Sequence, residues 1–343
     1  MKPRSLIFVG SGITSAGVIA ALLLIFTLPQ SCTQTVVDGC VIEPNTECLA
    51  RNLSGVNLKE ADLNHATIRL VDMRRADLSF ANLEGADLSF SSMWGAHMKG
   101  VQASGARLSN ASLPGANLED AELNNSQLTW VFAAGANMKG VDLSGASMVA
   151  TYLENSDLRG AKLAGAFMPA ANLDEVQAKG IDLRGSQFLF GSAWAAELSD
   201  TNATRANFTW ADFWRANLRR ANLRGVDMSF ANLQGAFLEG ADLSGVTWNE
   251  TICPDGTWSD ENDGETCEGH LNPVPWDATL RSSWETRRNN ARPAHLSRPS
   301  THLHQRNSAP QAKPHTTHTP SSQGSRVVRP KTPSTGPSFQ FVE

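Results

Sequence analysis

The chain has 343 residues, of which 41% are hydrophobic and 18% are charged, and its formal net charge is −5 at pH 7. A net charge this small and negative argues against a protein that binds nucleic acid through a strongly basic surface. Changes in the sequence pattern divide the chain into five parts, at residues 1–30, 31–52, 53–250, 251–270 and 271–343.

Residues 1–30 are typical of a segment for export or membrane insertion. Lys2 and Arg4 precede an uncharged apolar run from Leu6 to Leu28, which is long enough to span a bilayer as a helix. Basic residues before the run and acidic residues after it keep the N-terminus inside. We therefore expect an N-terminal apolar helix, either a cleaved signal or a transmembrane anchor that contacts the membrane. The rest of the chain is expected to be extracytoplasmic: membrane-anchored, periplasmic or secreted.

In residues 53–250, every fifth residue from Leu53 to Trp248 is apolar, and these 40 positions hold only Leu, Met, Ile, Ala, Phe or Trp. From Val56 onward, a small or β-branched residue stands two positions before each of them. A period of five matches neither a helix nor a strand, so each five-residue unit must contain its own bend. The first and third residues of a unit then point into a core, and the fifth, often Gly, suits a turn. The pattern predicts a solenoid.

The units resemble the pentapeptide-repeat family, whose unit is A-(D/N)-L-x-x; residues 81–90, for example, read Ala-Asn-Leu-Glu-Gly-Ala-Asp-Leu-Ser-Phe. The resemblance implies an all-β protein, a right-handed quadrilateral parallel β-helix with four units per coil and about ten coils. The sequence supports a coil of 20 residues, because Gly is frequent at the fifth position on three of the implied faces. On the fourth face it never occurs, and that column runs through Leu70, Phe90, Asn110, Trp130, Ala150, Ala170, Phe190, Trp210, Phe230 and Glu250.

Sorting the outward residues by 20 brings most large aromatic side chains to one corner and one side. This candidate interaction face, here called the aromatic face, contains Phe90, Trp94, Trp130, Phe132, Tyr152, Phe190, Trp194, Trp210, Trp214 and Phe230. Aligned exposed aromatics mark interaction sites, but they also stabilise a ladder simply by stacking on one another. Phe190, Trp210 and Phe230 are close enough to stack, whereas Phe90 and Trp130 are two coils apart. The next side carries a basic ladder of Lys59, Lys99, Lys139, Arg159, Lys179 and Arg219.

All five cysteines lie outside the 40 core positions, and Cys32 has no obvious partner. Disulfides Cys40–Cys48 and Cys253–Cys267 would close an N-terminal cap (31–52) and a C-terminal cap (251–270) in an oxidising compartment. Free buried thiols are the alternative. The C-terminal cap also looks like the segment that follows the repeats in exported members of the family. Residues 271–343 are rich in Pro, Ser, Thr and His and hold ten Lys or Arg against three acids. Their composition predicts a disordered basic tail.

We expect no catalytic site, no metal site and no cofactor. The sequence has no Ser-His-Asp order, no glycine-rich phosphate loop and no CxxC pair, and the residues outside the repeats are too few and too polar to fold a catalytic domain. The expected function is a non-enzymatic, exported structural or interaction rod that binds a protein or polymer through the aromatic face. Its oligomeric state is open.

The resemblance supplies an alternative, because some family members mimic duplex DNA and act on DNA gyrase. Two features argue against it here. The N-terminal segment would remove the repeats from the cytoplasm, and residues 51–250 hold 22 acids against 17 bases, which is only mildly acidic.

Overall fold

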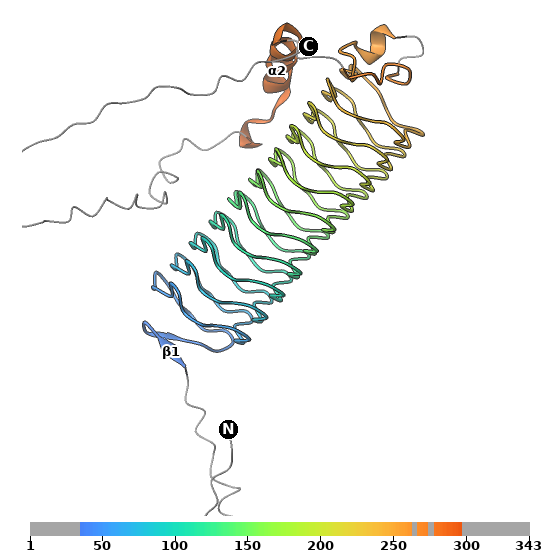
Figure 1. Ribbon diagram of the computed structural model, residues 1–343. Coiled ribbons are helices and arrows are strands. Elements are labelled where there is room, and N and C mark those ends of the chain that lie inside the picture. Colours follow the sequence, from blue (N-terminus) through green and yellow to red (C-terminus); the bar gives the residue numbers. More distant parts are fainter. Residues whose placement is uncertain (1–34, 263–265, 274–277, 297–343) are drawn as a thin grey trace, which may run out of the picture. The chain divides into compact units, whose positions relative to one another are not determined.

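In a computed structural model of the chain, the described residues are 35–262, 266–273 and 278–296. They form a right-handed β-helix solenoid whose coils stack along one axis (Figure 1). Parallel bridges join residues 20 positions apart, from Glu47 with Thr67 to Asn232 with Ile252. Four five-residue units therefore make one coil, as the sequence predicts. Each side contributes a single bridged residue between turns, so the coils contain isolated bridges in place of long strands.

Units with Asp or Asn at the second position can satisfy all of their backbone N–H groups, as residues 86–90 illustrate. The N–H of the first residue donates to the core residue of the preceding unit, and that of the second donates to the coil before. The third and fifth residues donate to the coil after. The N–H of Ser89 donates to the side chain of Asp87, which explains why Asn or Asp recurs at the second position. No backbone donor of this unit is left unpaired, as a tightly wound chain requires.

The fifth residue of each unit turns the corner with a left-handed backbone. Gly85 has φ +64° and Phe90 has φ +63°. Glycine adopts this conformation freely, whereas a side chain there costs roughly 1–2 kcal/mol. Large residues at corners therefore occupy positions where glycine would be favoured.

The core is a column of the third residues, flanked by the small first residues. Leu143, near the middle, is fully buried. Phe188, Phe208 and Phe213 form one cluster in this column, with ring centroids 5.0–6.0 Å apart. The neighbouring core positions Ala193 and Ala203 are small, so local volume is conserved.

Both ends of the solenoid carry disulfides. Strands β1 (Val36–Val37) and β2 (Cys40–Val41) form an antiparallel pair, and Cys40 is bonded to Cys48. At the other end, Cys253 is bonded to Cys267 around the short helix η1 (Ser259–Glu261). Cys32 and the apolar segment 1–30 lie outside the described residues. Among the residues that are described, no helix combines the length and apolar character needed to cross a membrane.

The expectation that all of 271–343 is disordered is wrong in part. Residues Ala278–Ala291 form helix α2, and Ala294–Leu296 form the short helix η2. Polar composition predicted disorder because the segment has too few apolar residues for a core of its own. It is ordered by docking on the solenoid, through the contacts described below. Residues 297–343 lie outside the described residues.

Candidate functional site

The later coils bring the aromatic face together as stacked rings. Phe190, Trp210 and Phe230 form a continuous stack on one corner, with centroids 6.3 and 4.6 Å apart and planes within 8°. Trp194 and Trp214 stack beside them at 5.6 Å. These spacings follow from the coil repeat, because residues 20 apart are neighbours across a parallel ladder.

Residues 278–296, here called the strap, cover this part of the aromatic face. Trp284 of α2 is fully buried, and its indole Nε1–H donates to the carbonyl oxygen of Phe230 at 2.8 Å. Leu296 of η2 packs with Ala150, Ala170 and Phe190. Only 8% of Phe190 and 7% of Trp214 remain exposed. The two small alanines of the corner column therefore form the seat for Leu296.

Charged contacts hold the strap as well. Arg281 forms an ion pair with the buried Asp212 at 3.2 Å and lies over the ring of Trp214. Burial raises the pKa of the Asp212 carboxyl, and the positive charges of Arg281 and Arg288 oppose the rise. Arg288 donates to the carbonyl oxygens of Trp210 at 3.1 Å and Gly191 at 2.9 Å. The strap thus binds corner carbonyls and one buried carboxylate in addition to aromatic rings.

The earlier coils leave the same corner uncovered in the described structure. Leu70 is 60% exposed and Phe90, its neighbour one coil on, is 45% exposed. The guanidinium of Arg69 lies 5.7 Å from the ring of Phe90, and that of Arg75 lies 5.5 Å from the ring of Trp94. We call these five residues the open patch. Between the open patch and the strap, Trp130, Phe132 and Tyr152 are half-buried and in contact with one another.

The basic ladder does not present free positive charge. Each of its six members forms an ion pair in the structure, involving Lys59–Glu60, Lys99–Glu119, Lys139–Asp157, Arg159–Asp157, Lys179–Asp200 and Arg219–Glu239. The hydrogen bond from Arg159 is the largest influence on the carboxyl of Asp157 and, with Lys139, lowers its pKa to about 2. The predicted ladder is therefore a row of exposed ion pairs.

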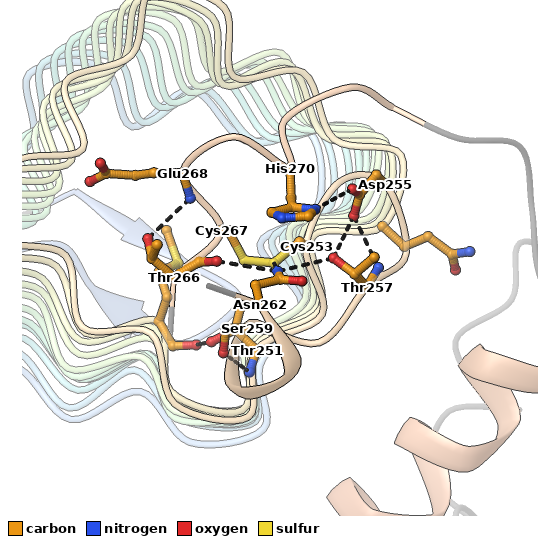
Figure 2. Close-up of a disulfide and its surroundings, with 12 residues drawn as sticks. Thr251, Cys253, Asp255, Thr257, Ser259, Asn262, Thr266, Cys267, Glu268 and His270 are labelled. Carbon is orange, nitrogen blue, oxygen red and sulfur yellow. Dashed lines mark hydrogen bonds and ion pairs between the residues drawn. A yellow bond between two sulfur atoms is a disulfide. The ribbon is translucent and has the colours of Figure 1, made fainter. Parts of the chain in front are cut away.

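The C-terminal cap is a closed polar network around its disulfide (Figure 2). Asn262 donates to Thr257 and to the carbonyl oxygen of Thr266, and the ring Nδ1 of His270 lies 2.8 Å from Asp255. Burial acts to raise the pKa of Asp255, but hydrogen bonds from Thr257 and His270 outweigh it and the pKa is lowered. Within the described ranges, no cluster of His, Cys, Asp or Glu could hold a metal ion.

The period of the sequence predicts the aromatic face but does not reveal the strap, which covers the part of that face on the later coils. Trp284 is a single large apolar residue in a polar run, and Arg288 contacts backbone carbonyls that no sequence pattern reveals. A usable signal was present in the corner column, where Ala150 and Ala170 interrupt a series of larger residues.

The comparison with protein-family models agrees with this architecture. The family model for pentapeptide repeats matches eight copies, over residues 52–89, 81–120, 104–140, 121–160, 151–188 and 206–245, more than half of the chain. A comparison with curated protein sequences finds no match.

Several solved structures are similar. HetL, a pentapeptide repeat protein involved in heterocyst differentiation regulation from the cyanobacterium Nostoc sp. strain PCC 7120, is 27% identical, with a TM-score of 0.40 over 72% of this chain and all of HetL. QnrB1, a plasmid-mediated fluoroquinolone resistance protein, is 16% identical, with a TM-score of 0.31 over 59% of this chain and 92% of QnrB1. A thylakoid-lumen pentapeptide repeat protein from Arabidopsis thaliana is 25% identical, with a TM-score of 0.17 over 34% of this chain and 68% of its own. With the family model matched over most of its coils, this chain belongs to the pentapeptide repeat family.

Proposed function

We propose that this protein is a non-enzymatic, extracytoplasmic interaction rod that binds a protein or polymer partner through the open patch of its aromatic face. Pentapeptide repeat proteins are generally structural or interaction proteins, which supports the non-enzymatic part of the proposal. The rod would act passively, as a rigid surface on which side chains recur at regular intervals.

One observation carries the proposal: Leu70 and Phe90 are large and exposed, and their backbone has a left-handed conformation. They have φ of +58° and +63°, and 60% and 45% of their surface is accessible. Each therefore combines the backbone cost of a corner with the cost of exposed apolar surface. On the later coils, the strap compensates equivalent costs by covering the rings. A partner that covers Leu70 and Phe90 would do the same on the early coils, and Arg69 and Arg75 would add polar contacts.

Photo-crosslinking from position 90 in the full-length protein, expressed in its own host, tests the proposal. We expect a discrete adduct from a photoreactive residue at 90. The matched control is position 167, because Phe167 is 47% exposed but lies outside the aromatic face. In parallel, Phe90→Gly should abolish the adduct formed from position 94 without lowering thermal stability, since glycine suits this backbone. Identical adducts from positions 90 and 167 would contradict the proposal.

The extracytoplasmic location is tested by intact mass and thiol labelling of the protein from membrane, soluble extracytoplasmic and cytosolic fractions. The proposal rests on the apolar segment before residue 30 and on cysteines placed to form two disulfides. Four blocked cysteines in a membrane or extracytoplasmic fraction are the expected result. Five free thiols in a cytosolic protein would contradict export.

That second outcome would favour the alternative function, a DNA mimic acting on DNA gyrase. The basic ladder side does not favour this alternative, because acids there are matched by bases. A supercoiling assay with purified gyrase gives the direct comparison. We expect no change in gyrase activity at protein concentrations that saturate the crosslinking partner.

A further inference from the structure

We propose that a groove on the later coils binds an oxyanion group, phosphate or sulfate, carried on an extended polymer. The groove has a volume of about 560 Å³ and is lined by Arg184, Gly185, Thr204, Arg205, Arg224, Gly225 and Ser244. It contains no residue of the aromatic face, so this proposal and the proposed function stand or fall separately.

The three arginines differ in whether a carboxylate pairs with them. Arg184 forms a two-pronged ion pair with Asp182, and Arg224 lies 3.6 Å from Asp242. Within the described part of the chain, Arg205 forms no ion pair with any carboxylate. Two of the three guanidinium groups that line the groove are paired with carboxylates, and the charge of Arg205 is in excess.

The sequence of this side explains the excess. The second positions of the units that line the groove are Asp182, Asn202, Asn222 and Asp242, so the two central coils carry neutral amides where the flanking coils carry acids. Asn202 and Asn222 keep the turn hydrogen bonds to the backbone that an aspartate would make. The fold is preserved while negative charge is removed beside Arg205.

The backbone position of Arg205 is a second, independent indication. It lies in a corner column where the preceding residues Gly145, Gly165 and Gly185 and the following residues Gly225 and Gly245 are all glycine. Arg205 has φ +58°, a conformation that favours glycine. This conformation has a backbone free-energy cost, and it places an unpaired cation in a groove. Such costs are concentrated at functional positions.

The side chain of Arg205 extends along the next residue of its corner column, Gly225. The Cγ atom of Arg205 lies 3.6 Å from where a Cβ of residue 225 would be, so its stem runs over Gly225 toward the next coil. Arg205 and Arg224 both line this groove, and like charges gathered in one groove repel one another. An oxyanion between Arg205 and Arg224 would relieve this repulsion, and guanidinium groups bind phosphate and sulfate geometry with paired N–H donors.

The shape of the groove favours a polymer over a free ion. Arg184, Arg205 and Arg224 belong to three successive coils, and coils in a parallel ladder are spaced by about 4.8 Å. Arg184 and Arg224 lie two coils apart in one column, and Arg205 lies on the intervening coil in the adjacent corner column, so the cations are spread along the rod axis. The glycines at 185 and 225 leave the floor between them without side chains.

Fluorescence anisotropy at low salt tests the proposal with full-length protein in detergent. Two labelled probes are compared: an inorganic polyphosphate chain and a heparin-type sulfated oligosaccharide. Arg205→Gly should weaken binding of the preferred probe roughly tenfold, the effect of losing one charged hydrogen-bond donor. Its melting temperature should be unchanged or higher. Arg205→Lys should fall between, because lysine keeps the charge but not the paired donors.

Arg220→Gly is the matched control. Arg220 is also an arginine with a left-handed backbone, at φ +55°, but it pairs with Asp200 outside the groove. We expect Arg220→Gly to leave binding within about twofold of the natural protein, since it removes only diffuse attraction. The probe that the natural protein binds more tightly identifies the bound group as phosphate or sulfate. We expect Arg205→Gly to lose this preference. Equal effects of Arg205→Gly and Arg220→Gly, or no effect of Arg205→Gly, would overturn the proposal.

Discussion

Replacing Trp284 by alanine should release the strap while leaving the coils folded. An aromatic side chain of this kind buries about 150–250 Å², which corresponds to roughly 4–6 kcal/mol of burial free energy. Its hydrogen bond to Phe230 adds about 1 kcal/mol, and measured truncations of buried aromatics cost about 3–5 kcal/mol. Helix α2 has 14 residues, a length that is marginal for an isolated helix. Without Trp284, the remaining contacts of the strap include Leu296 and the arginine contacts to Asp212 and the corner carbonyls, whose groups can be hydrated once the strap detaches.

Hydrogen exchange measured by mass spectrometry separates the possible results. In Trp284→Ala, amides of 278–291 should lose protection, whereas peptides from the repeat region should keep it. Ser283→Ala, an exposed position on the same helix, is the control and should change neither. Persistent protection of α2 would show that Trp284 is not its anchor. Loss of protection throughout the coils would show that the strap is part of one cooperative unit with them.

Three further predictions concern the coils. Leu143→Asp should lower the free energy of unfolding by more than about 4 kcal/mol, because it buries an unpaired charge. The control Leu143→Met should lower it by under about 1.5 kcal/mol, and thermal melts of both variants measure the difference. Gly191→Ala should also destabilise, because its Cβ would overlap the ring of Phe188, and adding Phe188→Leu should recover part of the loss; a stable single variant would refute the packing argument. Asp157 has a folded pKa of about 2, below its ordinary value of 3.8, so its contribution is present above pH 3.8 and is lost as pH falls toward 2. Asp157→Asn should remove that part of the acid dependence, an effect under about 1 kcal/mol because the pair is exposed; acid titrations of both proteins that superimpose would contradict it.

The solenoid was predictable because its information is local and repeated. Every core position from Leu53 onward reports the same five-residue geometry, and the bridges 20 residues apart follow once four units make a coil. The strap was not predictable in the same way. Its order depends on Arg288 donating to corner carbonyls, 78 residues away in the chain at Trp210, and on Leu296 packing on the still more distant Ala150 and Ala170. These contacts follow no periodicity. The period of 20 predicts that Phe190, Trp210 and Phe230 are neighbours, and they stack. The division of the aromatic face into covered and open parts depends on the long-range contacts.

The strap also restricts how the protein can change in length. The contacts of the strap along the solenoid extend from Glu250, which pairs with Arg287, to Ala150, on which Leu296 packs. A duplicated coil of 20 residues between these points would move them about 4.8 Å apart and pull the strap off one anchor. The same duplication before Trp130 would leave every strap contact in place. Growth by whole-coil duplication is therefore compatible with the strap only toward the N-terminal end, where the open patch lies.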